Sequence, residues 1–308
     1  MIVNGTEGVD VDEDRYRIVV PVAEPETQKN LLRLAAASAA SHPDSEDPEI
    51  VAVNVIQVPS QTALEQNVQF EEERIEKQRE LLDGAREAAT DLDINLRTRA
   101  IVGRDIDQTV LSVIEEEEAD QVVLGRREGD RTRTNVFGST IDPVLKNAPC
   151  EVTIVDLDKT ELGSVLALAG PGPHAPVAAR RAAEFARLEG TVPTLLNVQQ
   201  PSDEEDDDPI ERGEAAIESI AKQAGLEPGS YESEVLVSED VQSAILEELD
   251  EYDTICAGVS EKSSVSKIMF GSIAEQVQQR GGENVVMVRS PYETHWSIGE
   301  AVAERLSA

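Results

Sequence analysis

One pattern occurs twice in this chain and limits the folds that it can adopt. In the first copy an apolar run ends at Gly125, a polar loop follows, and residues 137–140 (Phe-Gly-Ser-Thr) open a helical pattern. In the second copy Gly258 and residues 270–273 (Phe-Gly-Ser-Ile) hold the same places, 133 positions further on. Each copy then runs into another apolar stretch. This repetition predicts two structural units of one kind in tandem.

The repeated residues are also candidates for an anion site. A glycine that leaves a strand lets the backbone turn with φ > 0 and approach a ligand closely. A Gly-Ser pair at a helix start leaves free N–H groups and a hydroxyl where an anion can sit. The same residues are equally suited to make turns and to cap helices. The candidate residues are Gly125, Gly138, Ser139, Thr140, Gly258, Gly271 and Ser272.

Strand and helix patterns alternate along both halves of the chain. Short Val- and Ile-rich runs predict strands at 15–22, 49–58, 94–102, 122–124 and 152–155, and again at 165–169, 192–198, 233–237, 255–257 and 285–288. Helical spacing predicts helices at 25–41, 62–90, 105–118, 174–188, 209–224 and 240–249, with Asp105 capping the third. We therefore expect α/β architecture: two open sheets of five parallel strands, with helices on both faces. Ligands of such sheets bind beyond the carboxyl ends of the strands.

The length of 308 residues agrees with two domains. We place the first at 15–156 and the second at 163–290, with a loose lead-in at 1–14 and a C-terminal tail at 291–308. The tail has an apolar helical face that we expect to dock on its own domain, with a partner or a membrane surface as the alternative. The acidic run that follows Ser202 is expected to form a solvated loop.

The formal net charge of −35 is the strongest feature of the composition. A charge of this size repels itself in dilute salt, and concentrated salt screens that repulsion. We infer an ordinary fold with an acidic surface, adapted to a high-salt cytoplasm. The charge excludes nucleic-acid partners, because their phosphate backbone requires basic contacts.

Catalytic and metal sites find little support in the sequence. The histidines His42, His174 and His295 lie far apart and in no metal-ligand spacing. Cys150 and Cys256 lie in or beside apolar strand patterns, which favours small buried side chains over a disulfide. No apolar run approaches membrane-spanning length. We expect a cytoplasmic protein that is not an enzyme.

The stretch from Gly125 to Val155, with Ala148-Pro149-Cys150 before its last strand, resembles the universal stress protein superfamily. The resemblance covers both halves and implies an internal pseudo-dimer, with two five-stranded units stacked as in the dimers of the family. A homodimer of the whole chain is a further possibility. The nucleotide-binding branch of the family uses this motif to hold ATP phosphates. The matching residues here are Gly125, Gly138 and Ser139, and Gly258, Gly271 and Ser272.

Two departures from the family motif argue against ATP. Glu128 and Glu261 stand where the motif has its second glycine, and a carboxylate there repels phosphate. The first strand ends near Ala23, without the aspartate that reads the adenine–ribose side in the ATP-binding branch; Ala169 or Gly170 holds that place in the second copy.

The first copy alone keeps features that favour an anion. Gly129 can restore the turn, and a group of arginines crowds the loop: Arg126, Arg127, Arg131 and Arg133. These side chains suit either a phosphate or neighbouring acids such as Glu128 and Asp130. ATP or AMP is therefore expected, if at all, in the first domain only.

Three functions remain open. The first is a regulatory stress-response protein that acts through protein contacts without ATP. The second is a regulatory domain of a membrane transporter, because residues 17–26 resemble tandem domains fused to amino-acid or cation-chloride transporters. The third is a sensor of a nucleotide or second messenger.

Overall fold

The computed structural model describes residues 15–42, 47–57, 68–92, 94–126, 138–202, 208–259 and 283–291, without the side chains of 68–75 and 138–140. The predicted lead-in at 1–14 lies outside this part of the chain. So do residues 292–308 of the predicted tail and 203–207 of the predicted acidic loop.

Ten strands form one sheet in the order β3-β2-β1-β4-β5-β10-β9-β6-β7-β8. The first half supplies β1 (Arg17–Pro21), β2 (Glu49–Gln57), β3 (Asn95–Gly103), β4 (Gln121–Gly125) and β5 (Glu151–Asp156). The second half supplies β6 (Val165–Leu168), β7 (Thr194–Gln199), β8 (Glu232–Val237), β9 (Thr254–Gly258) and β10 (Asn284–Arg289). All pairings within each half are parallel, as the alternation of strands and helices predicts.

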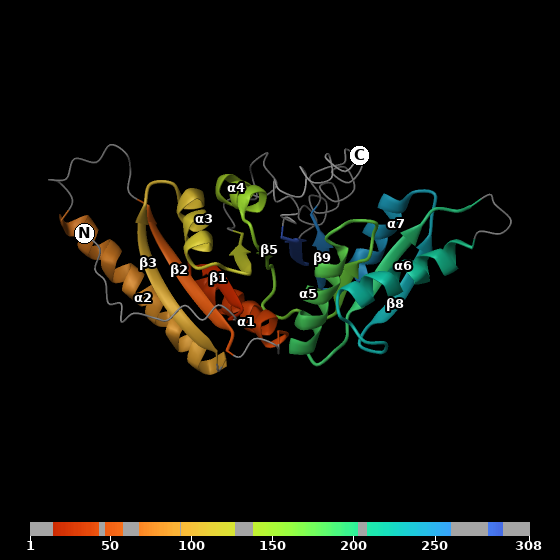
Figure 1. Ribbon diagram of the computed structural model, residues 1–308, viewed down its shortest axis with the longest axis horizontal. Coiled ribbons are helices and arrows are strands. Elements are labelled where there is room, and N and C mark those ends of the chain that lie inside the picture. Colours follow the sequence, from red (N-terminus) through yellow and green to blue (C-terminus); the bar gives the residue numbers. More distant parts are fainter. Residues whose placement is uncertain are drawn as a thin grey trace, which may run out of the picture.

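The two halves meet edge to edge through β5 and β10, which pair antiparallel with Ile154 opposite Met287. Figure 1 shows these strands at the centre of the molecule, with one half on either side. The five-stranded units are therefore joined into one continuous sheet, and the expectation of stacked units is wrong on this point. Because β10 runs against β5, the carboxyl ends of the two sets of strands lie at opposite edges of the sheet.

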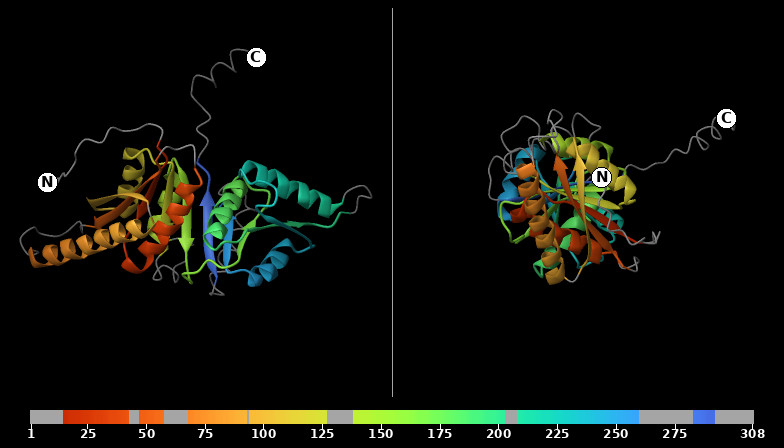
Figure 2. Two further views of the ribbon diagram at one scale, coloured as in Figure 1. Left: turned by 90° about the horizontal axis from the view of Figure 1, so that it is seen from below. Right: turned by 90° about the vertical axis from the view of Figure 1, so that its left-hand side faces the viewer.

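Helices cover both faces of this sheet (Figure 2). One face packs under α1 (Pro25–Ala40), α2 (Val68–Leu92), α5 (Ala175–Leu188) and α6 (Pro209–Gln223). The other packs under α3 (Ile106–Glu116), α4 (Gly138–Asn147) and α7 (Val241–Glu248), which continues into a 3-10 turn, η2 (Leu249–Glu251). Alternate side chains of each strand point to opposite faces, so Ile18 and Val20 enter the first core and Val19 the second. Helices α1 and α5 lie beside each other across the junction (Figure 1).

A buried ion network reinforces the junction. Glu151 on β5 accepts hydrogen bonds from Nε and Nη2 of Arg181 on α5, at 2.8 and 2.6 Å, and pairs with Arg180 as well. Arg181 also pairs with Glu184, whose carboxylate accepts a hydrogen bond from Ser38 of α1 at 3.0 Å. Burial opposes the charge of Arg181, but Glu184 and Glu151 raise its pKa, so the guanidinium stays cationic. Charges from both halves therefore hold the joined sheet together.

One local prediction needs correction. Asp105 precedes α3, but its side chain makes no capping hydrogen bond; its carbonyl oxygen instead accepts from the Thr109 hydroxyl at 2.8 Å.

The acidic end of α3 takes part in a second ion network. Glu117 is buried and forms ion pairs with Arg97 and Arg99 of β3.

The two cysteines agree with the sequence analysis. Cys150 and Cys256 are free and buried. Burial raises the pKa of Cys150 to about 12, and it raises the pKa of Cys256 as well. Both thiols are therefore protonated at neutral pH and serve as small packing groups.

Candidate functional site

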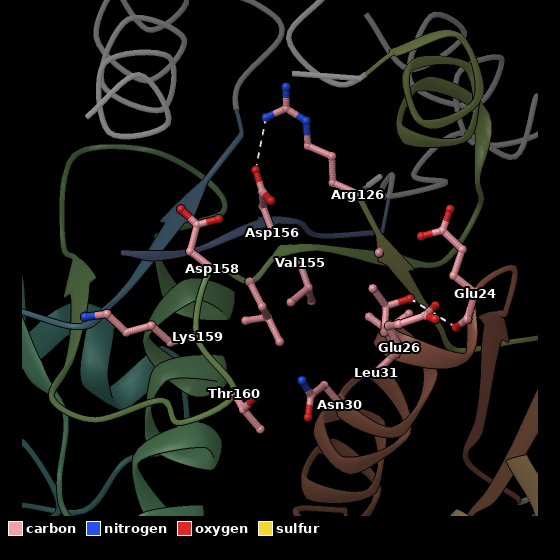
Figure 3. A pocket seen from close by; sticks show the side chains of 13 residues that line it. Glu24, Glu26, Asn30, Leu31, Arg126, Val155, Asp156, Asp158, Lys159 and Thr160 are labelled. Atoms are coloured by element: carbon pink, nitrogen blue, oxygen red, sulfur yellow. Dashed lines mark hydrogen bonds and ion pairs between the residues drawn. The ribbon is translucent and has the colours of Figure 1, made fainter. Parts of the chain in front are cut away.

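A cavity of about 390 Å³ lies at the carboxyl ends of β1, β4 and β5. This is the point where the strand order of the first half reverses, between β1 and β4, and such points are the usual ligand sites of open parallel sheets. Figure 3 shows the first two turns of α1 on one side of the cavity and the linker after β5 on the other. The lining residues are Glu24, Glu26, Thr27, Asn30, Leu31, Gly125, Arg126, Val155, Asp156, Leu157, Asp158, Lys159 and Thr160.

Gly125 ends β4 and lines this cavity. The sequence motif predicts that the backbone approaches a ligand closely at this glycine. A Cβ atom at this position would lie 2.8 Å from Cδ1 of Leu31 on α1. The absence of a side chain therefore lets α1 pack down onto the strand end. The glycine has a packing role that needs no ligand, which is the plainer of the two interpretations of the motif.

Arg126 follows Gly125 and is buried, with 8% of its surface exposed. Its backbone N–H donates to the carbonyl of Val155 at 2.9 Å, and its guanidinium donates to Asp156 at 3.1 Å. The sequence analysis considered Glu128 and Asp130 as acidic partners, but both lie outside the described residues. The partner that the structure gives is Asp156, from the end of β5 (Figure 3). This arginine is thus already neutralised by an acid of its own domain.

The second basic group of the lining is also paired. Lys159 donates to Asp253 of the second half at 2.8 Å, and this contact, with hydrogen bonds from Ser164, lowers the pKa of Asp253. Among the described residues, four carboxylates line the cavity (Glu24, Glu26, Asp156 and Asp158) against two cations (Arg126 and Lys159), which leaves this part of the lining with a formal charge of −2. A cavity with this balance repels phosphate groups.

The equivalent place in the second half is built differently. A Cβ at Gly258 would lie 2.8 Å from Cβ of His174 and 3.0 Å from its backbone carbonyl carbon. His174 precedes α5, and its Nδ1 accepts a hydrogen bond from the backbone N–H of Ser290 at 3.1 Å. The strand-to-helix connection is longer here, from 169 to 174, where the first half has only 22 to 24. This connection packs directly on the second glycine.

The remaining candidates divide between two groups. Gly138, Ser139 and Thr140 begin α4, as the motif predicts, although their side chains are not described. Arg127, Gly129, Gly271 and Ser272 lie outside the described residues, as do Glu128 and Glu261. The proposed effect of these two glutamates on phosphate binding therefore stays a prediction.

Most of the polar side chains that line the cavity are not among the residues that the sequence motif predicts. Glu24 and Glu26 come from the start of α1, while Asp158, Lys159 and Thr160 come from the segment treated only as a link between domains. Their signal in the sequence is position: each group directly follows a predicted strand, and those strand ends share one edge of the sheet.

Within the described residues, no group of three or more His, Cys, Asp or Glu side chains gathers in a way that could hold a metal ion. The described histidines make structural contacts. His42 stacks on Tyr16 with ring centroids 3.7 Å apart, and His174 contacts Ser290. No helix in the described ranges combines the length and apolar character needed to cross a bilayer.

Comparison with known proteins finds relatives over almost the whole chain. A universal stress protein from Archaeoglobus fulgidus has the same fold, with a TM-score of 0.60, 18% identity, and coverage of 90% of this chain and 97% of that one. The cytoplasmic domain of a prokaryotic cation chloride cotransporter superposes with a TM-score of 0.58 at 10% identity, covering 91% and 97% respectively.

One curated relative is a longer protein. The Na(+)/H(+) antiporter NhaS5 of Synechocystis sp. is 20% identical over 283 residues, which make up 90% of this chain. The chain spans only 39% of the length of that antiporter. The family profile described as "Universal stress protein family" matches twice, at residues 15–156 and 163–289. The chain therefore belongs to the universal stress protein family, with one copy of the family domain in each half.

Proposed function

We propose that this chain is a regulatory module that acts through contact with a partner protein, without ATP, and that its partner is an ion transporter of the membrane. The observation that carries the first part is the lining of the cavity. Its described residues carry a formal charge of −2, and Arg126, the cation next to the glycine turn, is paired with Asp156. A triphosphate would have to displace that pair and approach the remaining carboxylates.

The second half supports the same conclusion. Close packing of His174 on Gly258 occupies the place where a phosphate would approach the backbone of the turn. Ala23, two residues after the end of β1 in the first half, offers no carboxylate to a ribose.

The transporter partner is suggested by the relatives. This chain matches about two fifths of the Synechocystis antiporter, and the cotransporter domain shares its fold over most of both chains. A module of this kind would work at the cytoplasmic face of the membrane, either within a transporter chain or bound to one.

A direct test is ion transport in inverted membrane vesicles from cells that lack this chain. Adding the purified protein back is expected to change the rate of cation exchange, in molar KCl and in the absence of nucleotide. The matched control is the same protein after heat denaturation. An exchange rate that is the same with native and denatured protein would exclude the transporter partner.

The second candidate, a nucleotide sensor, has one specific observation in its favour. Gly125 lines a cavity at the switch point of the sheet, where this fold holds its ligands. Titration with nucleotides separates the two candidates, because only the sensor requires saturable binding.

A further inference from the structure

The ten described strands leave the joined sheet with two edges, β3 at the end of the first half and β8 at the end of the second (Figure 1). An edge strand presents unpaired N–H and C=O groups, and proteins block such edges with charged side chains. The six residues of β8 include Glu232, which is exposed, and Glu234. The nine residues of β3 include no acid, in a chain with 62 Asp and Glu residues. The edge at β3 therefore lacks the acidic charge that keeps copies of this chain apart.

The two charged side chains of β3 are already neutralised within the chain. Arg97 pairs with Glu49 of β2 at 3.1 Å. Arg99 pairs with Glu116 of α3 at 2.9 Å. Both arginines also pair with Glu117, at the end of the same helix. Because their charge is compensated inside each chain, these side chains neither require a partner nor repel an identical strand.

The hydrogen bonds of β2 identify the backbone groups of β3 that point away from the sheet. Glu49 donates its N–H to the carbonyl of Tyr16 at 2.9 Å, on the side of β1, and Val53 accepts there from Val22 at 2.8 Å. Odd-numbered residues of β2 therefore bond toward β1, and even-numbered residues bond toward β3. In a parallel pair, each even residue of β2 bonds to the odd residues on either side of its partner in β3. The backbone groups that point outward are those of Leu96, Thr98, Ala100 and Val102.

We propose that two copies of this chain pair through β3, antiparallel about a twofold axis at Ala100. A pairing centred on Arg99 would place the two copies of Arg99 opposite each other. Moving the axis to Ala100 pairs residues 97–103 of the two strands and places each arginine opposite an uncharged residue. Val102, with 65% of its surface exposed in the single chain, then lies opposite Thr98 and is covered. The homodimer that the sequence leaves open thereby has a defined surface.

The rest of the molecule fits this pairing. β5 and β10 already join two five-stranded units edge to edge and antiparallel within one chain. Beside β3, a hollow of about 280 Å³ opens toward α3 and has room for side chains of a second strand; Ile101 and Val113 are among its lining residues. Because β8 has acidic side chains at the other edge, the pairing closes at two copies and does not extend into a filament.

Sedimentation velocity of the full chain in molar KCl, over a series of protein concentrations, tests the inference. We expect a reversible monomer–dimer equilibrium without larger species, because molar salt screens the repulsion between acidic surfaces. V102K places a lysine on the paired edge and should weaken the dimer by at least about tenfold. The matched control is V237K, which adds the same charge at an exposed valine of β8 and should leave the dimer unchanged. Equal thermal midpoints of the two variants would show that V102K acts on pairing and not on folding.

Hydrogen exchange of the unaltered chain is a second test that needs no substitution. The amides of Thr98, Ala100 and Val102 should exchange more slowly as the protein concentration rises, whereas the amides of β8 should not change. The inference is overturned if the chain is monomeric at every concentration, if V237K weakens the dimer as much as V102K, or if exchange of these three amides is independent of concentration. Species larger than a dimer would also overturn it, because they require a second pairing edge.

Discussion

At the scale of single residues, two arginines of β3 are held by buried carboxylates. Arg97 pairs with both Glu49 and Glu117, and Arg99 pairs with Glu117. Burial alone would raise the pKa of Glu117, but hydrogen bonds and charge from Arg97 and Arg99 outweigh it and hold the pKa below its usual range. The run of acids that ends α3 is therefore part of an ion network and not only a solvated surface.

This network predicts a pH-dependent loss of stability in E117Q. A carboxyl with a lowered pKa in the folded state stabilises fully above its unfolded pKa, and the effect disappears as the pH falls through the folded value. E117Q should therefore lose about 2 kcal/mol of unfolding free energy at neutral pH and much less in acid. Denaturant unfolding at several pH values measures this, with E218Q as the exposed control. An equal loss at neutral and acidic pH would contradict the assignment.

At the scale of elements, the two glycine turns have the same sequence pattern but different neighbours. Gly125 meets the tip of Leu31, a flexible side chain, whereas Gly258 meets both the side chain and the backbone of His174. A side chain can move aside more readily than a connection that Ser290 holds by a hydrogen bond. The turn at Gly125 faces a cavity, whereas the turn at Gly258 is covered by His174.

G258A should therefore cost more stability than G125A. We expect G258A to lower the free energy of unfolding by about 1–3 kcal/mol. G125A should lower it by less, because a rotation of Leu31 can relieve the overpacking there. The control is G125A in the L31A background, compared with L31A alone, since shortening Leu31 removes the contact with the new methyl group. Thermal unfolding of these variants side by side provides the comparison, and an equal loss in G125A and G258A would rule out the asymmetry.

The strands were predictable from the sequence, while their neighbours were not. The run at 49–58 predicts a strand observed at Glu49–Gln57, because β-branched residues between polar and proline boundaries favour extended buried backbone. The patterns of Val152–Val155 and Val285–Val288 do not predict that these two strands pair with each other. A strand that is buried on both faces is apolar whichever strand lies next to it.

The candidate site was predictable to the same limited degree. Gly125 follows from local spacing, but that Glu26 and Asp158 line one cavity follows from the order of strands in the sheet. That order is a long-range property, which local patterns do not carry. The contact of His174 with Gly258 was missed for the same reason, since it depends on how the connection from 169 to 174 folds back.

At the scale of the whole molecule, a chain with a formal net charge of −35 folds into one continuous sheet with two hydrophobic cores. Self-repulsion opposes this compact state in dilute salt. The Debye length falls from about 10 Å at 0.1 M to about 3 Å at 1 M salt, so molar KCl removes most repulsion between surface charges.

The thermal midpoint should therefore rise steeply as KCl increases and level off near molar concentration, as screening becomes complete. Calorimetric scans across a KCl series measure this. An osmotically equivalent series of sucrose, which does not screen charge, separates screening from general exclusion effects. A midpoint that is unchanged by KCl, or that rises equally in sucrose, would contradict adaptation to high salt.

The central claim is that this pair of universal stress domains works without a bound nucleotide. Titration calorimetry of the full chain in molar KCl with ATP, AMP and cyclic dinucleotides tests it most directly. We expect no saturable heat from any of these ligands, because the described lining of the cavity in the first half is net acidic and His174 packs on Gly258 in the second half. Saturable binding of any of them at one site per chain would contradict it.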